Sequence, residues 1–208
     1  MPTHCLALFG ATGGTGRQIV TQALEAGHTV QALVRDPARL PIQHPQLHLI
    51  TGNVLDPDAV ERTITGTDAV IVTLGNTANN PDWIVSEGTR VIVAAMQKLG
   101  VRRLIVISSL GVGDSRDQVP AFFKVLMKTV LKKAMEDKER QEQIVAASGL
   151  DWTIVRPGGL TNGPRTGRYR AGLDRTLVAG QVSRADVAEF VLRQLDDRTY
   201  LHKAPAIT

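Results

Sequence analysis

Apolar runs of strand length alternate with helix-like segments along the whole chain, and this alternation constrains the fold most. The runs are continuously apolar, which is typical of strands buried on both faces. Strands of this kind, separated by helices, form a parallel sheet with helices on either side. The runs lie at residues 5–9, 29–34, 47–51, 68–74, 103–108 and 151–155. We therefore predict an α/β fold built on a doubly wound parallel sheet.

Helical segments lie between and after these runs. Asp56 followed by Pro57, and Ser183 further on, are typical of helix N-termini. Glycines scattered through residues 162–180 predict an irregular C-terminal cap, and the tail predicts a short final strand. With no linker and no repeat, residues 1–208 are expected to form a single domain. The predicted helices cover residues 16–26, 56–66, 80–100, 121–148 and 183–195.

The composition excludes several classes of protein. Cys5 is the only cysteine, so an internal disulfide and a cysteine-rich zinc site are excluded, and we expect no metal site. No apolar run approaches the roughly 18 residues of a membrane span, and the N-terminus lacks the basic segment of a secretory signal. We therefore expect a cytoplasmic protein without a membrane partner. The net charge of +4 suits a small anionic ligand and does not indicate nucleic-acid binding.

The segment GATGGTG, residues 10–16, joins the first predicted strand directly to the first predicted helix. Its glycines permit a tight turn, close approach of the backbone to a pyrophosphate, and close packing of the helix on the strand. The free amides at the helix N-terminus would bind the phosphates, with threonine hydroxyls as further donors. We therefore predict a dinucleotide site in which the contacting residues are Gly10, Thr12, Gly13, Gly14, Thr15 and Gly16.

The end of the second predicted strand indicates which nicotinamide cofactor binds. An acidic residue at this position usually holds the ribose 2′-hydroxyl of NAD. Here the strand ends in Val34-Arg35, and a guanidinium suits the 2′-phosphate of NADP. Arg39 can join Arg35 if Pro37 begins a helical turn. We predict a preference for NADPH, although Asp36 could contact the ribose and admit NAD.

Ligands of such folds bind at the carboxyl ends of the strands, so the residues that follow each strand are further candidates. Asn53 and Val54 are placed for the adenine, Leu74 and Gly75 for the ribose, and Ser108 and Ser109 for the nicotinamide. The segment Arg156-Pro157-Gly158-Gly159 follows the sixth run, and we predict that Pro157 contributes to the site.

The motifs GATGGTG, LVRDPARLP, DAVIVTLG, ISSLG and SGLDWTIVRPGGL together resemble the atypical short-chain dehydrogenase/reductase superfamily, in its NAD(P)-binding, NmrA-like branch. Within that branch the chain is most similar to the flavin reductase (NADPH) and biliverdin-IXβ reductase group. The resemblance runs over nearly the whole chain. It implies a Rossmann fold and an NADPH-dependent reductase of flavins or linear tetrapyrroles that acts as a monomer on a small-molecule substrate.

The chain departs from these relatives in its catalytic residues. The Tyr-x-x-x-Lys pair is missing, Gly159 replaces the histidine of the flavin-reductase relatives, and Asn53 replaces their usual aspartate. Ser109 is the best candidate for orienting the nicotinamide carboxamide. Lys138 is a second catalytic candidate, the alternative being a solvated lysine on a helix.

Two other classes of function stay open for this sequence. One is a non-enzymatic NADP-binding protein that senses redox state or stabilises a complex, which the missing catalytic residues would suit. The other is an NAD(P)-dependent epimerase or quinone reductase.

Overall fold

The computed structural model describes residues 2–76, 82–121 and 129–208. Their main sheet has the strand order β3-β2-β1-β4-β5-β6-β10-β8. Neighbouring strands are parallel throughout, except that β8 runs antiparallel to β10. The strands are β1 (Cys5–Phe9), β2 (Thr29–Val34), β3 (Leu47–Thr51), β4 (Ala69–Val72), β5 (Arg103–Ile107), β6 (Asp151–Pro157), β8 (Ala171–Gly172) and β10 (Ala206–Ile207). This is the Rossmann order, which confirms the predicted fold class.

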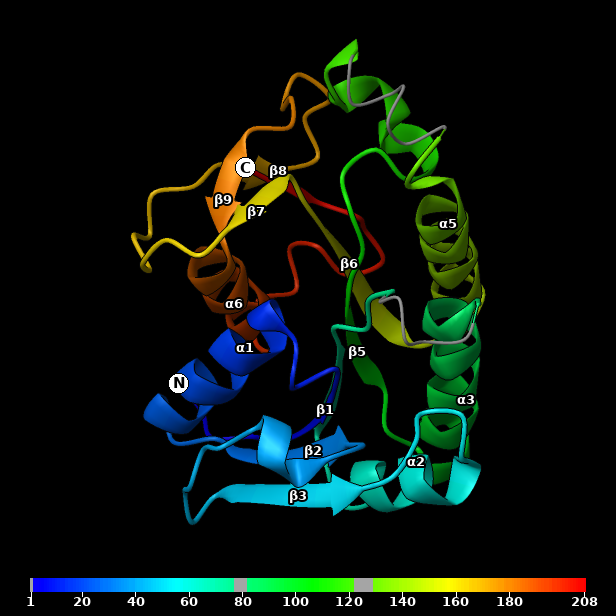
Figure 1. Ribbon diagram of the computed structural model, residues 1–208, viewed down its shortest axis with the longest axis vertical. Coiled ribbons are helices and arrows are strands. Elements are labelled where there is room, and N and C mark those ends of the chain that lie inside the picture. The colour runs from blue at the N-terminus through cyan, green and yellow to red at the C-terminus, as the bar shows by residue number, and fades with distance from the viewer. Residues whose placement is uncertain (1, 77–81, 122–128) are drawn as a thin grey trace.

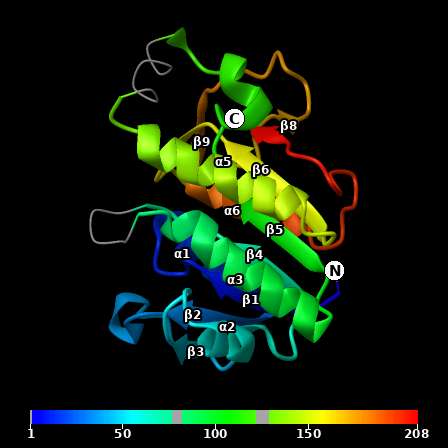
Figure 2. The same ribbon diagram turned by 90° about the vertical axis from the view of Figure 1, so that its right-hand side faces the viewer.

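Helices cover both faces of the sheet (Figure 1). Two of them, α1 and α6, lie side by side on one face, and the rest of those listed below lie on the opposite face, which Figure 2 turns toward the viewer. The helices are α1 (Gly14–Glu25), α2 (Pro57–Ile64), α3 (Ile84–Leu99), α5 (Lys132–Ala146) and α6 (Arg184–Arg193). Within the described ranges, no helix is long and apolar enough to cross a membrane.

Two hydrophobic clusters, one on each face, explain why the strand sequences are apolar without alternation. Leu6 and Leu8 of β1 belong to the cluster under α1 and α6. Ala7 and Phe9 of the same strand belong to the cluster under α2 and α3. Successive side chains of a strand point to opposite faces, so a strand covered on both sides needs apolar residues at every position.

Several predicted boundaries were wrong. Helix α1 begins at Gly14 rather than Gly16, because the amide of Arg17 already donates to the carbonyl of Gly13. Strand β6 does not end before Pro157, because β10 pairs with it at Arg156 and Pro157.

The starts of two predicted helices fall partly in the undescribed residues 77–81 and 122–128. The described part of the first helix begins at Ile84. Within the second, Ala121 is helical and α5 begins at Lys132, after a turn at residues 129–131.

The C-terminal cap is irregular, as expected, and contains a small parallel sheet of β7 (Gly159–Thr161) and β9 (Gln181–Ser183). Ser183 caps α6 as predicted, since its hydroxyl accepts from the amide of Asp186 at 2.9 Å. The Asp186 carboxylate in turn accepts from the amides of Thr166 and Gly167 at 2.7 and 2.9 Å. This carboxylate therefore ties the loop of the cap to the start of α6.

Candidate cofactor and active site

The glycine-rich turn after β1 is built by close contacts between backbone atoms. Gly10 has φ +91°, and a Cβ atom there would lie 2.7 Å from the carbonyl carbon and oxygen of Thr73. A Cβ atom at Gly16 would overlap the carbonyl oxygen of Gly10. Gly13 is the N-cap of α1, and its amide donates to the Gly10 carbonyl at 3.1 Å. The first and last glycines are therefore required by packing alone.

The N-terminus of α1 suits the phosphates of a dinucleotide. Gly13 and Gly14 are exposed, α1 has no capping side chain, and its first turn contains no acidic residue. The partial positive charge of the helix end is thus left for an anionic ligand. At the end of β4, a side chain added at Gly75 would meet no atom within 4 Å. The residues present therefore fit the predicted cofactor.

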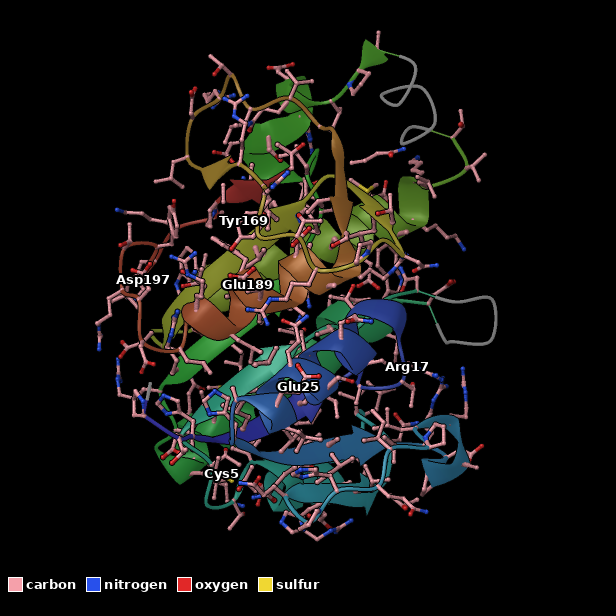
Figure 3. The ribbon with its side chains drawn as sticks, turned by 90° about the vertical axis from the view of Figure 1, so that its left-hand side faces the viewer. Cys5, Arg17, Glu25, Tyr169, Glu189 and Asp197 are labelled. Carbon is pink, nitrogen blue, oxygen red and sulfur yellow. The ribbon has the colours of Figure 1, made fainter. Side chains whose placement is uncertain are left out.

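Two residues that hold this turn were missed from the sequence. The Thr73 hydroxyl donates to the carbonyl of Gly10 at 3.0 Å. Figure 3 labels Arg17 near the N-terminal end of α1. Its Nε donates to the carbonyl of Thr12 at 3.1 Å, and its Nη2 donates to the carbonyl of Arg39 at 2.7 Å. Arg17 directly follows the last glycine of the motif, and that position was the only available signal.

The segment after β2 has the predicted form. A helical turn does begin at Pro37, but Pro37–Arg39 is a single 3-10 turn (η1) that Arg35 precedes, so joint binding of a phosphate by Arg35 and Arg39 stays a prediction. Both arginine side chains are exposed and have no partner within the part of the chain that the structure describes. The Asp36 carboxylate accepts from the amide of Ala38 at 3.0 Å and caps the turn. The arginines are thus open to a phosphate while the acid has a structural role.

The turn after β3 is the place where the adenine is predicted to bind. The Asn53 side chain accepts from the amide of Leu55 at 3.1 Å and fixes the turn after β3. Val54 is buried beside Gly88 of α3, where a Cβ atom would come within 2.9 Å of Val54 Cγ1 and 3.1 Å of Leu74 Cδ1. Gly88 was missed because an isolated glycine inside a helical pattern gives no signal of what approaches it.

Ser108 and Ser109 lie at the end of β5, where the nicotinamide is expected. The Ser108 amide donates to the carbonyl of Val155 at 2.8 Å, and its buried hydroxyl has no partner among the described residues. The Ser109 hydroxyl donates to the carbonyl of Leu110 at 3.2 Å. The Leu110 amide donates to the carbonyl of Pro157 at 2.9 Å, which joins this tip to β6.

Lys138 reaches this tip from α5. Its ammonium donates to the carbonyl of Ile107, the residue before Ser108, at 3.2 Å. Burial lowers the pKa of Lys138 from 10.5 to about 8, although the carboxylates of Glu142 and Asp137 act in the opposite direction. The side chain is half-buried and bonded to a backbone carbonyl, so Lys138 is not a fully solvated helix lysine. A lysine with this pKa can hold or release a proton near neutral pH.

Arg156 is not an open cation at the strand end. Its side chain is buried in β6 and donates from Nε and Nη2 to the two carboxylate oxygens of Glu142, at 3.0 and 2.6 Å. Its Nη1 donates to Asp114 of the short 3-10 helix Gly113–Gln118 (η2). This cluster ties β6, α5 and the segment after β5 together, and no local pattern in the sequence predicted it.

The comparison with known families agrees with this geometry. The family described as NAD(P)H-binding matches residues 10–198, from the first glycine of the turn to the end of the cap. The chain belongs to this NAD(P)H-binding family. Its cofactor is therefore a nicotinamide dinucleotide, and the preference for NADPH stays a prediction.

Individual relatives cover most of the chain. An uncharacterized chloroplastic protein of Arabidopsis thaliana is 34% identical over 206 residues, which cover 93% of this chain and 72% of that protein. The uncharacterized sugar epimerase YhfK of Bacillus subtilis is 29% identical over 208 residues, 97% of this chain and 92% of that protein. The structure of ChuY, an anaerobillin reductase from Escherichia coli O157:H7, matches with a TM-score of 0.83 and 26% identity over 98% of this chain and 96% of that chain. The predicted resemblance is confirmed at the level of the family: this is an NAD(P)H-binding Rossmann-fold oxidoreductase.

Other candidate residues of this NAD(P)H-binding domain have structural roles. Tyr169, whose ring could offer a planar contact to a substrate, packs edge-on against Phe190 of α6 with ring centroids 6.0 Å apart, and burial raises its pKa. His4 contacts Asp196 at 3.0 Å, and His202 contacts the carbonyl of Leu150 at 3.0 Å. Phe122 and Phe123, whose rings could also contact a planar substrate, lie outside the described residues.

Proposed function

We propose that the protein is an NADPH-dependent reductase whose acceptor is a flavin or a linear tetrapyrrole. The observation that carries this proposal is the half-buried ammonium of Lys138, which donates to the carbonyl of Ile107 directly before Ser108, whose buried hydroxyl has no partner among the described residues. We expect these two groups to serve the acceptor in place of the missing Tyr-x-x-x-Lys pair. The similarity to ChuY over nearly the full length of both chains supports an acceptor of the bilin type.

The open arginines after β2 support NADPH as the electron donor. Arg35 and Arg39 can form charge-assisted hydrogen bonds to a 2′-phosphate, whereas a free ribose diol would gain little from them. We expect Asp36 to stay with the amide of Ala38, and not to select NADH.

A bound nicotinamide supplies a hydride to the acceptor. The chain holds the two rings together, and positioning alone can lower a barrier by several kcal/mol. A flavin accepts at N5 and can take its proton from water. Addition of hydride to a bilin carbon also requires a proton on a pyrrole nitrogen. Lys138 can give that proton from its ammonium and recover it from solvent, so that charge balances over the cycle.

The experiment is to mix the purified protein with NADPH and either FMN or biliverdin and to follow absorbance at 340 nm. For biliverdin the rate should fall as the pH rises through about 8, because the acidic form of Lys138 is lost. In Lys138→Met the rate with biliverdin should no longer fall as the pH rises through about 8. FMN reduction should vary little between about pH 6 and 8, since no protein acid acts on the flavin.

Lys98→Met is the matched control, because Lys98 is an exposed lysine that pairs with Glu61 at 2.8 Å on the surface. Its pH profiles should match those of the unchanged protein. If the protein binds NADPH but oxidises it neither with FMN nor with biliverdin, the proposal is contradicted. That result would favour the non-enzymatic NADP-binding alternative. The relative named as a sugar epimerase makes nucleotide sugars the next substrates to test in that case. A monomeric state and a cytoplasmic location stay predictions.

A further inference from the structure

Arg184, the first residue of α6, lies against the glycine-rich turn. A Cβ atom added at Gly14 would be 2.7 Å from both Cδ and Nε of Arg184. Gly14 therefore has a second function besides presenting its amide: it leaves room for an arginine from the C-terminal cap. Nothing in the local sequence around residue 184 indicated this contact.

The position of Arg184 is set by contacts on both sides of it. Helix α6 runs beside α1 (Figure 3), and Gln22 of α1 donates a buried hydrogen bond to the carbonyl of Ala185 at 2.8 Å. The Arg184 Nη1 donates to the side-chain oxygen of Asn162 at 2.8 Å. Within the described residues, Nε and Nη2 have no acceptor. One edge of the guanidinium is held by the cap, and the other is open beside the turn.

We propose that Arg184 binds the diphosphate of the nicotinamide cofactor and closes the phosphate site from the cap side. The Nε–Nη2 edge of an arginine can bind two phosphate oxygens at once. The turn itself offers amides and helix polarity but no positive side chain in the first turn of α1 except Arg17, whose Nε and Nη2 are used on carbonyl oxygens. A dianionic diphosphate therefore gains its nearest charged partner from α6. This inference rests on NAD(P)H binding, and not on the identity of the acceptor.

The same contacts couple the cofactor to the cap. Asn162, which holds Arg184, follows β7 directly, and Asp186, two residues after Arg184, holds Thr166 and Gly167. A diphosphate bound to Arg184 should therefore also order the segment that carries Asn162. Asn162→Ala should weaken cofactor binding severalfold, because it frees the guanidinium without removing it.

The test is calorimetric titration with two probes, NADP⁺ and adenosine 2′-monophosphate, which has the 2′-phosphate but no diphosphate. Arg184→Ala should weaken the binding of NADP⁺ about ten- to a hundredfold, which is the effect of losing one or two charge-assisted hydrogen bonds. Adenosine 2′-monophosphate should bind as before. Arg198→Ala is the matched control: Arg198 is exposed and pairs with Asp151, and its loss should change neither affinity.

An unchanged NADP⁺ affinity in Arg184→Ala would overturn the proposal. If in addition the KM for FMN rises and that for riboflavin does not, the guanidinium binds the phosphate of the acceptor instead.

Gly14→Ala provides a second variant in case Arg184→Ala damages the cap. The added methyl group displaces a flexible arginine side chain, so the fold should persist. Gly14→Ala alone should weaken the binding of NADP⁺. The same substitution should weaken it much less when Arg184 has already been replaced by alanine. Equal effects in both backgrounds would show that the two residues act independently, and would contradict the inference.

Discussion

The turn after β1 and the tip after β5 lie at the same edge of one sheet but are built in different ways. The first is made of glycines whose missing side chains allow backbone atoms to meet, as Gly16 does with Gly10. The second is held by charged side chains from distant segments, namely Glu142 and Asp114 on Arg156. The nucleotide side therefore depends on local sterics, and the catalytic side on long-range ion pairs.

This difference has a consequence for mutation. A side chain added at an exposed glycine of the turn can block a ligand while leaving the hydrophobic core unchanged. Loss of one member of a buried ion pair leaves an uncompensated charge and reduces the stability of the whole fold. A substitution at the exposed Gly13 should thus reduce binding alone, whereas the loss of Glu142 should reduce stability.

Gly13→Val should have the largest effect, on binding alone. A branched side chain would occupy the space of the pyrophosphate, and NADPH binding should fall below detection in calorimetry. The fold should persist, because φ at Gly13 is −74° and an added Cβ atom would meet its nearest neighbour, the Gly10 carbonyl, at 3.4 Å. Gly16→Ala is the contrasting variant, and it should lose binding and thermal stability together. A Gly13→Val protein that binds NADPH normally would place the phosphates elsewhere.

Glu142→Ala should have the opposite signature. It leaves the buried Arg156 guanidinium with only Asp114, and unfolding in urea should show a loss of about 3–5 kcal/mol. Glu139→Ala is the matched control, because Glu139 pairs with Arg116 nearer the surface and should cost at most about 1 kcal/mol. Equal losses for the two variants would mean that the buried cluster contributes no more than a surface pair.

Arg35→Ala tests the selectivity of the nucleotide side. It should remove one or two charge-assisted hydrogen bonds to the 2′-phosphate. The binding of NADPH should weaken by about 1.5–3 kcal/mol for each bond lost. NADH affinity, measured on the same protein, should not change. If the unchanged protein binds NADH and NADPH equally well, the arginines do not select the cofactor.

The smallest effect concerns the amino ends of the strands, where His28 directly precedes β2 and is bonded to His4, which directly precedes β1. The His4 amide donates to Nδ1 of His28 at 3.0 Å, and burial, followed by the neighbouring His4, lowers the pKa of His28 below 6.5. The unfolded chain therefore binds this proton more readily, and the stabilising contribution is lost as the pH falls below 6.5 through the folded-state value.

His28→Asn keeps an acceptor for the His4 amide but does not titrate. Its stability in urea should vary less between pH 5 and 7 than that of the unchanged protein, while NADPH affinity stays the same at both pH values. An identical pH dependence of stability in the two proteins would assign the titration to another group.

Much of the nucleotide side could be predicted because its determinants are adjacent in the chain. The spacing of Gly10, Gly13 and Gly16, and the turn that begins at Pro37, place their residues by local geometry alone. The contribution of Arg184 could not be predicted in the same way, because it reaches Gly14 only through the packing of α6 on α1.

The sequence by itself determined the parallel sheet, the glycine turn and the exposed arginines after β2. Each of these follows from apolar periodicity or from backbone conformation over a few residues. Only the tertiary structure decided the roles of Lys138, Arg156 and Arg184. Burial beside Ile107 lowers the pKa of Lys138, Glu142 pairs with Arg156, and α6 brings Arg184 against Gly14. Desolvation and ion pairing depend on which distant segments meet, and no local pattern in the sequence records that.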